Sequence, residues 1–284
     1  MNPKIWFITG ISRGLGLGLA RAVLARGDVV VGTTRDGSSP GGIDSTRLSV
    51  LQLEMTDREQ IEQTVAAAHR RHGRLDVVVN NAGYGLLGSI EEAKPQDVDH
   101  LFAVNFFAPL GVIQASLPLL RAQRHGHIVN ISSIAGFAPA AGAGLYGASK
   151  FALDGLSQSL AQEVAPLGLR VTVVEPGAFR TDFLSAHSLR RTPGDIEDYQ
   201  ASSGRSVDGL LSRAGQQLGD PDRAALAIIE AVDADEPPLH LLLGSDALRR
   251  ARVRLDQFEA DLRHWEDVSR RTDFASETGA GSAR

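Results

Sequence analysis

Two side chains that could exchange a proton, Tyr146 and Lys150, stand four residues apart in a chain with only three tyrosines. Positions i and i+4 share one face of a helix, so the lysine ammonium can lie near the tyrosine phenol. A neighbouring cation favours the phenolate and lowers a pKa that is ordinarily about 10. The pair therefore predicts a general acid or base, although two solvated residues of an ordinary helix would show the same spacing.

A hydroxyl and a buried amide could complete this site. Ser133 follows an apolar run and is expected at the carboxyl end of a strand, where its hydroxyl could hold a substrate oxygen beside the phenol. Ser132 is the alternative, because neighbouring residues of a strand point to opposite faces. Asn105 interrupts an apolar helical segment, where a buried amide needs partners. It either anchors a water chain to Lys150 or caps an irregularity in the helix.

A glycine-rich turn directly follows the first apolar run. Gly10 permits a tight turn, Gly14 lets backbone N–H groups approach a pyrophosphate, and Gly16 lets the next helix sit close to the sheet. The helix N-terminus would then face the anion. In a chain with 30 glycines such spacing is weak evidence alone, and its place between a strand and a helix gives it weight.

The end of the second apolar run indicates which dinucleotide is preferred. An NAD site usually has an acidic residue there, whereas an NADP site supplies cations for the 2′-phosphate. Here the run ends with Thr34 and Arg35, and Arg35 could converge with Arg13 on a dianionic phosphate. The alternative is that Asp36 binds the ribose and both arginines are solvated. NADP(H) is the expected cofactor, with NAD(H) also possible.

Alternating apolar runs and helical segments must position these residues, and this alternation predicts a doubly wound α/β fold with one seven-stranded parallel sheet. Helices are expected near 14–26, 57–72, 97–123, 146–165 and 221–233. The expected strands are Ile5–Thr9, Val29–Thr34, Ser49–Leu53, Asp76–Asn80, His127–Ser132, Arg170–Glu175 and Leu239–Leu243.

Two segments depart from the alternation. Residues 178–220 have little periodicity and are interpreted as a substrate lid beyond the carboxyl end of a strand, a disordered loop being the alternative. Residues 246–284 follow the main domain, 1–245, as an amphipathic helix and a frayed tail. The helix is expected to pack on its own domain or on a partner subunit.

Composition bounds the function classes. The chain has 284 residues, 43% of them hydrophobic and 22% charged, which predicts one packed domain. Its net charge of −5 disfavours nucleic acid as a partner, and its lack of cysteine excludes disulfides and thiolate metal sites. No metal site is expected. No apolar stretch is expected to reach the roughly 20 residues that cross a bilayer, so a soluble cytoplasmic protein is expected.

Taken together, these motifs resemble the short-chain dehydrogenase/reductase family. The glycine turn, Asn80-Asn81-Ala82-Gly83, Asn105, Ser133, the Tyr146/Lys150 pair and Glu175-Pro176-Gly177 followed by Thr181 match the family in order and spacing over about residues 4–245. The resemblance implies a single-domain Rossmann fold and an oxidoreductase that moves hydride between a nicotinamide and a carbonyl or alcohol. Thr34 and Arg35 match the NADP-preferring pattern.

The resemblance also implies the roles of individual residues. Tyr146 is the general acid/base, Lys150 lowers its pKa and binds the nicotinamide ribose, Ser133 polarises the carbonyl, and Asn105 supports a proton relay. Leu145 and Phe183 would join Ser133 and Tyr146 at the substrate. Besides Tyr146 and Lys150, the implied cofactor contacts are Gly10, Ser12, Arg13, Gly14, Leu15, Gly16, Thr34, Arg35, Glu54, Met55, Asn81, Ala82, Gly83, Pro176, Gly177, Phe179 and Thr181.

Two features differ from the common family core. Glu54 stands where the family usually has an aspartate facing the adenine, so that contact could be shared with Asp57. The C-terminal extension and the segment Tyr84–Gly88 resemble a subgroup near 17β-hydroxysteroid and retinol dehydrogenases, which hints at a bulky apolar substrate. The helices at 97–123 and 146–165 resemble those that pair subunits in this family, which implies a homodimer or homotetramer.

Three rival classes stand beside a carbonyl reductase or alcohol dehydrogenase. An epimerase or dehydratase with bound NAD has a different glycine spacing and is disfavoured by Arg35. A non-catalytic NADP-sensing regulator would keep the phosphate turn and lose the catalytic groups, yet Asn105, Ser133, Tyr146 and Lys150 are all present. Nothing favours a purely structural protein. An NAD-dependent alcohol dehydrogenase remains an alternative.

Overall fold

Seven strands form one parallel sheet in the computed structural model, which describes residues 3–43 and 45–274. Their order is β3-β2-β1-β4-β6-β7-β9, so the predicted α/β class and seven-stranded sheet are confirmed. Each strand begins and ends within one residue of its expected bounds. The strands are β1 (Ile5–Ile8), β2 (Val29–Thr34), β3 (Leu48–Gln52), β4 (Val77–Asn80), β6 (Gly126–Ile131), β7 (Leu169–Pro176) and β9 (His240–Leu243).

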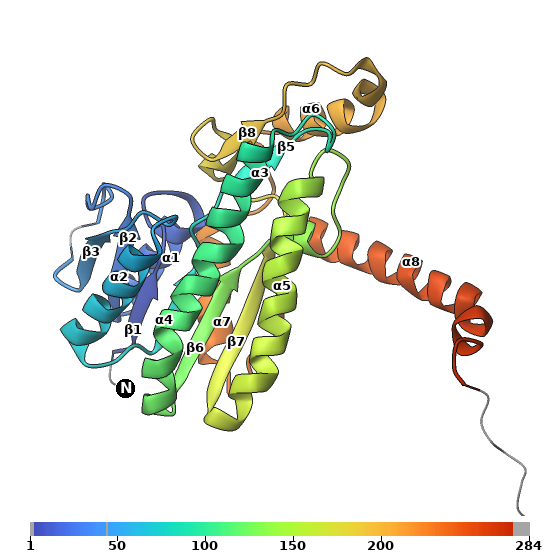
Figure 1. Cartoon of the computed structure of the whole chain (residues 1–284). Coiled ribbons are helices and arrows are strands. Elements are labelled where there is room, and N and C mark those ends of the chain that lie inside the picture. Colours follow the sequence, from blue (N-terminus) through green and yellow to red (C-terminus); the bar gives the residue numbers. More distant parts are fainter. Residues whose placement is uncertain (1–2, 44, 275–284) are drawn as a thin grey trace, which may run out of the picture.

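Helices cover both faces of the sheet (Figure 1). Helices α1 and α7 pack together on one face, whereas α2 and α4 pack together on the other, next to α5. The 21-residue α5 begins two residues before the expected start. The main helices are α1 (Gly14–Ala25), α2 (Arg58–His72), α3 (Pro95–Phe102), α4 (Ala108–Gln123), α5 (Gly144–Val164), α6 (Arg205–Leu211), α7 (Pro221–Asp233) and α8 (Ser245–Arg270).

Strand β1 shows why these sequences form a buried parallel sheet. Successive side chains of a strand point to opposite faces. Trp6 and Ile8 accordingly pack in the core under α1 and α7, and Ile5 and Phe7 pack in the core under α2, α4 and α5. All four residues are buried, so the strand is apolar throughout rather than alternating.

The strand order reverses between β1 and β4. The chain leaves β1 toward β2 and β3 on one side, then returns to β4 on the other. The segments that follow β1 and β4 therefore diverge and leave a crevice at the carboxyl ends of the strands, where doubly wound sheets bind their ligands.

The segment 178–220 is folded over this end of the sheet, and the disordered-loop alternative is wrong. It contains β8 (Leu189–Arg191), which pairs in parallel with β5 (Gly85–Leu87), as well as α6. Leu87, Leu189 and Val207 form a small core of their own beneath α6. Figure 1 shows this segment above the carboxyl ends of the strands.

The helical run Pro95–Gln123 corrects one expectation from the sequence. It is 29 residues long and its most apolar window has a mean hydropathy of 1.5, so by length and composition it could cross a membrane. In the fold, Val112, Ile113 and Leu120 of this run are buried against the sheet and its neighbouring helices. Its apolar character is therefore that of a core helix.

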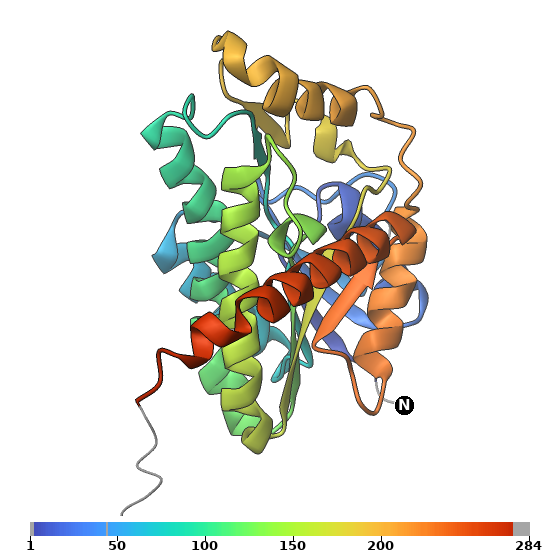
Figure 2. The same ribbon diagram turned by 90° about the vertical axis from the view of Figure 1, so that its right-hand side faces the viewer.

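Helix α8 extends away from the sheet in Figure 1, and in Figure 2, turned by 90°, it crosses in front of the sheet and α5. Ala247 and Ala251 are buried against Ile134 and Ala138, and every described residue beyond Arg254 is exposed. The expected amphipathic helix is thus present, but only its first two turns pack on its own domain. The part of the predicted frayed tail from 277 to 284 lies outside the described residues.

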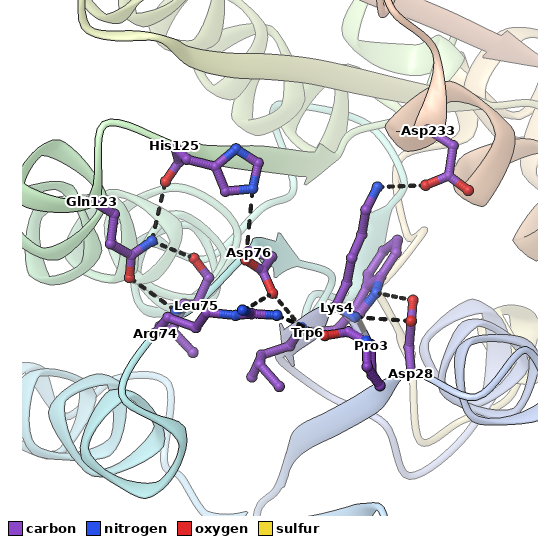
Figure 3. A network of polar contacts seen from close by, with 11 residues as sticks. Pro3, Lys4, Trp6, Asp28, Arg74, Leu75, Asp76, Gln123, His125 and Asp233 are labelled. Atoms are coloured by element: carbon purple, nitrogen blue, oxygen red, sulfur yellow. Dashed lines mark hydrogen bonds and ion pairs between the residues drawn. The ribbon is translucent and has the colours of Figure 1, made fainter. Parts of the chain in front are cut away.

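Two buried carboxylates anchor the opposite, amino-terminal edge of the sheet (Figure 3). Asp76 accepts a hydrogen bond from the Ile5 amide at 2.7 Å and one from Arg74 at 3.1 Å. Asp28 accepts the Trp6 indole N–H at 3.0 Å. Each carboxylate therefore satisfies a donor on β1 and fixes that strand against its neighbours.

Candidate active site

An open cleft of about 1300 Å³ occupies the carboxyl end of the sheet. It lies where β1, β2, β4, β6 and β7 end. Three of the predicted site residues, Gly16, Asn105 and Leu145, do not line it, and the other twenty do: Gly10, Ser12, Arg13, Gly14, Leu15, Thr34, Arg35, Glu54, Met55, Asn81, Ala82, Gly83, Ser133, Tyr146, Lys150, Pro176, Gly177, Phe179, Thr181 and Phe183.

The turn after β1 opens the N-terminus of α1 toward the cleft. Gly10 and Gly14 have φ angles of 71° and 60°, a left-handed conformation that glycine adopts without strain. Arg13 at the N-cap gives α1 no capping hydrogen bond, and the first turn of this helix has no acidic residue. The first N–H groups of α1 therefore keep their capacity to bind an anion.

Gly16 lies behind this turn. A Cβ at this position would overlap the side-chain amide of Asn81 and the carbonyl oxygen of Gly10. That amide donates to the carbonyl oxygens of Thr9 and Gly10, both at 2.9 Å. Gly16 therefore lets α1 approach the end of β4, and it shapes the turn without lining the cleft.

The cations near the end of β2 are arranged differently from the expectation. Arg35 is 83% exposed in its side chain and lies 3.9 Å from Glu54. The Arg13 guanidinium turns instead to the lid segment and donates to Ser188 and to the His187 carbonyl, each at 3.0 Å. The expected convergence of the two arginines is therefore wrong for this structure, and Arg35 is left as the cation at the strand end.

The carboxylates near the end of β2 already accept hydrogen bonds from residues close to them in the chain. The Asp36 carboxylate accepts the backbone and hydroxyl groups of Ser38, so it belongs to its own turn. Asp57 caps α2 by accepting the Gln60 amide at 2.9 Å. Glu54 lines the cleft and accepts the backbone and hydroxyl of Thr56. The alternative in which Asp36 binds the ribose is therefore disfavoured.

Tyr146, Lys150 and Ser133 come together at the ends of α5 and β6. The Lys150 ammonium lies 6.0 Å from the centre of the Tyr146 ring and donates to the Ile131 carbonyl at 2.9 Å. The Ser133 hydroxyl lies beside the phenol, where it lowers the pKa of Tyr146. Ser132 points instead into the interior, toward Asp154. The structure therefore favours Ser133 over Ser132 as the hydroxyl of the site.

Burial dominates the protonation of this pair. It raises the pKa of Tyr146 to about 12, against a smaller lowering by the Ser133 hydroxyl. It lowers the pKa of Lys150 to about 8, against a smaller raising by Asp154. In the protein alone the phenol is thus protonated at neutral pH, and the expected lowering of its pKa by Lys150 is outweighed by desolvation.

Asn105 lies one layer behind the cleft, in a π-helical turn, Ala103–Phe107, between α3 and α4. Its side chain accepts the Tyr84 amide at 3.1 Å and donates to the Tyr84 carbonyl at 2.9 Å and to Ser149 at 3.1 Å. A Cβ on Gly83 would lie 3.1 Å from the Asn105 oxygen and 3.6 Å from the Lys150 ammonium. Asn105 therefore provides hydrogen-bond partners for the backbone groups of Tyr84 from within an irregular turn of helix. It also borders the space near Lys150.

A cluster of buried acids lies on the interior side of Lys150. Asp154 and Glu175 are 4% and 1% exposed, and among the described residues none gives their oxygens a hydrogen bond of ordinary geometry. Burial raises the pKa of Asp154 to about 7. His240 on β9 lies 3.3 Å from Glu175, which raises the pKa of the imidazole. Sequence reasoning did not single out this cluster.

The first turn of α8 supports the turn that follows β7. The Asp246 carboxylate accepts the Ala178 amide at 2.9 Å, and a Cβ on Gly177 would overlap that carboxylate. Asp246 also lines the cleft. It escaped sequence reasoning because 68 residues separate it from Ala178 and no local pattern marks it.

Part of the cleft wall, beside Tyr146, is apolar. The rings of Phe183 and Tyr146 lie 5.7 Å apart, and Ile134, Leu184, Val207 and Leu210 also line this part. Leu145 is half-buried outside the cleft, so its predicted place at the substrate is wrong. The cause is helical geometry, since the residue next to Tyr146 on a helix points about 100° away from it.

These residues fit a nicotinamide dinucleotide. The uncapped N-terminus of α1 suits the pyrophosphate, Arg35 suits the adenosine end, and the Gly177 turn closes the opposite end of the cleft beside Tyr146 and Lys150. Such an elongated cleft, with anion donors near one end and an acid-base pair at the other, supports hydride transfer chemistry.

Comparison with known proteins gives a consistent picture. The family model for the short chain dehydrogenase matches residues 4–191. Oxidoreductase BOA17 of Botryotinia fuckeliana is 38% identical over 270 residues, covering 94% of this chain and 98% of its own. Human retinol dehydrogenase 8 is 31% identical over 258 residues, covering 84% of this chain and 80% of its own.

Solved structures are also similar. A short-chain dehydrogenase from Streptomyces avermitilis has 39% identity and a TM-score of 0.88, and the match covers 96% of this chain and all of the other. ElxO, solved with NADP bound, has 28% identity and a TM-score of 0.72, and the match covers 87% of this chain and 99% of the other.

Proposed function

Because the chain belongs to the short-chain dehydrogenase family and is an oxidoreductase acting on CH–OH or C=O groups with NAD(P), we propose that it interconverts a carbonyl and a secondary alcohol with NADP(H). The observation that carries the proposal is the meeting of Tyr146, Ser133 and Lys150 in one wall of a cleft that also holds the uncapped N-terminus of α1.

The proposed chemistry is divided among three side chains. The bound cofactor supplies or accepts the hydride. Tyr146 holds the proton that passes to the carbonyl oxygen, and Ser133 donates a hydrogen bond to that oxygen as negative charge develops on it. Lys150 binds the nicotinamide ribose and places positive charge near the phenol. Asn105 holds the backbone around Gly83 and borders the path by which Lys150 is reprotonated.

Carbonyl reduction is the direction that the protonation states favour. A phenol whose pKa is about 12 holds its proton at neutral pH and is ready to donate it. Oxidation would first require removal of that proton, which positive charge on Lys150 and on the oxidised nicotinamide would assist. We therefore propose that reduction has the lower pH optimum of the two directions.

Replacing Tyr146 by Phe tests the assigned chemistry. Loss of the proton donor is expected to lower kcat by about 10² to 10⁴ for ketone reduction, with NADPH binding by fluorescence nearly unchanged. Tyr84→Phe is a matched control, because Tyr84 also lines the cleft. Near-wild-type turnover by Tyr146→Phe would remove the tyrosine from the mechanism. Binding of NADPH without turnover by the wild-type protein would favour the NADP-sensing alternative.

The NADP(H) preference is the second part of the proposal. Arg35 is exposed at the end of β2, beside the hydroxyl of Thr34, and Asp36 is engaged by Ser38. The NADP bound to the similar protein ElxO supports this choice. Arg35→Asp is expected to lower kcat/KM for NADPH about tenfold or more and to improve NADH, because a dianionic phosphate would meet a carboxylate. Arg121→Asp is the control, because Arg121 is exposed on α4 and does not line the cleft. If Arg35→Asp leaves the ratio of kcat/KM for NADPH to kcat/KM for NADH unchanged, as Arg121→Asp should, the NADP(H) preference is contradicted.

The substrate is proposed to be apolar around its reacting group. Phe183, Ile134 and Val207 support this, since they line the apolar part of the cleft beside Tyr146, as does similarity to a retinol dehydrogenase. A series of methyl ketones of increasing chain length is expected to show falling KM with each added methylene, by up to about fourfold per step. A flat series would contradict an apolar subsite.

A further inference from the structure

The cleft carries far more positive than negative charge. Among the described residues, the carboxylates of Glu54, Asp182 and Asp246 line it, against seven arginines: Arg13, Arg35, Arg190, Arg205, Arg213, Arg249 and Arg250. The whole chain has the opposite balance, with a net charge of −5. Because a cleft of one sign gathers ligands of the other, the cleft of this acidic protein is suited to anions.

A bound dinucleotide accounts for only part of this charge. Arg13 belongs to the glycine turn and Arg35 to the end of β2, and both segments would face the cofactor. Arg190 lies over the Tyr84 ring at 5.1 Å and 3.5 Å from Asp97. The arginines of α6, of the turn that follows it and of the first turns of α8 are left without a role in cofactor binding.

Arg250 on α8 lacks a counter-ion. It is half-buried in the cleft wall, and its guanidinium donates to the Ala138 carbonyl, a neutral acceptor. Burial lowers the pKa of Arg250, against a smaller raising by Asp246. The Asp246 carboxylate is engaged by the Ala178 amide, and Arg250 forms no ion pair within residues 3–43 and 45–274. A partly buried charge without a counter-ion is unfavourable, so this position is suited to a bound anion.

The position of Arg250 is on the substrate side of the cleft. Ile134 and Ala138 pack against the first turns of α8, and the Ala138 amide donates to the Ile134 carbonyl at 2.7 Å. Ile134 directly follows Ser133, whose hydroxyl would hold the carbonyl oxygen of the substrate. One turn of backbone therefore separates the partner of Arg250 from the proposed reacting group, and the side chains along it are apolar.

Two arginines face the same cleft from the lid. Arg205 begins α6 and Arg213 follows its end, and both line the cleft. Figure 2 shows α6 above the first turns of α8, where Arg249 also lines the cleft. These three arginines are exposed, and with the part of the chain that the structure describes they form no ion pair and no side-chain hydrogen bond. Their guanidinium donors are therefore available to a ligand.

We propose that the substrate carries a carboxylate or phosphate at the end remote from its carbonyl, and that the arginines of α8 and the lid bind it. The inference rests on the proposed carbonyl reduction and names the class of its substrate, an apolar ketone with an anionic end. Guanidinium groups bind both anions through paired N–H donors. Arg250 supplies the half-buried contact, and Arg249, Arg205 and Arg213 surround the charge at the mouth of the cleft.

A series of oxo-acids, each with a methyl ketone and a terminal carboxylate, tests the inference on the full chain with NADPH. The methyl ester of each acid is the neutral control, and the phosphate monoester of the matching hydroxyketone distinguishes phosphate from carboxylate. Methylene spacers of increasing length locate the anion site, and one length is expected to be best. For that length, kcat/KM is expected to be about tenfold or more higher for one anionic compound than for the ester. This preference is expected to fall with added NaCl.

Two double variants test the assigned arginines. Arg249→Gln/Arg250→Gln and Arg205→Gln/Arg213→Gln are each expected to lower the ratio of kcat/KM for the anionic compound to kcat/KM for its ester by about tenfold. The ratio cancels losses of folded protein. Arg252→Gln is the matched control, because Arg252 is an exposed arginine of α8 that does not line the cleft, and its ratio should equal that of the wild type.

The outcomes separate this inference from the proposed function. A wild-type ratio near one would overturn the anionic end and leave carbonyl reduction standing. A preference for the anionic compound that persists in both double variants would overturn the assignment of the arginines. A raised Kd for NADPH in those variants, with an unchanged ratio, would overturn it in favour of cofactor binding. Absence of turnover with every ketone would overturn the proposed function and this inference with it.

Discussion

Replacing Asp154 by Asn is expected to make the protein more stable at alkaline pH. Asp154 is 4% exposed on α5, one turn after Lys150, and burial raises its pKa from 3.8 to about 7. The folded protein therefore keeps a proton that the unfolded chain releases. Stability contributed by this group is present in acid and is lost as the pH rises from about 4 to about 7.

The size of the effect follows from the shift. About three pKa units at 1.36 kcal/mol each correspond to about 4 kcal/mol over the whole range. Between about pH 5 and about pH 8 the wild-type protein should lose roughly 2 to 3 kcal/mol relative to Asp154→Asn, because the amide has no proton to lose.

His127 titrates in an overlapping range with the opposite sign. Burial lowers its pKa to about 4, so the stability that it contributes is lost as the pH falls from 6.5 toward 4. His127 is present in both proteins, and its effect cancels when the two unfolding free energies are subtracted. The difference between wild type and variant thus reports Asp154 together with the Lys150 and His240 charges that it faces.

Urea unfolding at several pH values from about 5 to about 8 measures this difference. Glu163→Gln is the control, an exposed acid on the same helix, and its curve should run parallel to that of the wild type. A difference for Asp154→Asn that stays constant with pH would refute the reasoning. The variant should also move the alkaline limit of kcat/KM to lower pH, since Asp154 raises the pKa of Lys150.

Three further changes have defined outcomes. Asn105→Ala should destabilise the fold by about 2 to 3 kcal/mol in urea unfolding, because both backbone groups of Tyr84 lose their buried partner. Asp246→Ala frees the Ala178 amide and should raise the Kd for NADPH about tenfold in a fluorescence titration, with little change in thermal stability. Asp76→Ala should lower the unfolding free energy by about 1 to 3 kcal/mol and leave kcat unchanged, since Asp76 lies at the far edge of the sheet.

The parts of the site that lie close together along the chain were predictable from the sequence. Tyr146 and Lys150 are set by helical spacing, and Ser133 follows a strand whose end was recognisable from its apolar run. The sheet was predictable for the same reason, since each buried strand is a short apolar run. The structure then selected Ser133 over Ser132 through the direction of its side chain.

Contacts between distant segments could not be derived in this way. Arg13 bonds Ser188, 175 positions along the chain, and its expected place beside Arg35 was wrong because the lid offered it a partner. Asp246 reaches the Gly177 turn only because β9 lies beside β7. No local pattern encodes either contact, and both depend on how the sheet brings the ends of separate strands together.

Desolvation sets the protonation of the proposed site more than the pairing of charges does. Tyr146 and Asp154 both become weaker acids on burial, whereas Lys150 becomes a weaker base. At neutral pH the Tyr146 phenol holds its proton, and Asp154 is close to its pKa of about 7. The pKa of Lys150, about 8, is close enough to neutral pH that a change of charge at either residue alters the protonation of its amine. A dinucleotide that covers Lys150 would add charge and remove water in the same place, so cofactor binding and proton transfer must be coupled. The coupling predicts that the apparent pKa in the pH profile of kcat, which reports the cofactor complex, differs from that in the profile of kcat/KM for NADPH, which reports the free protein.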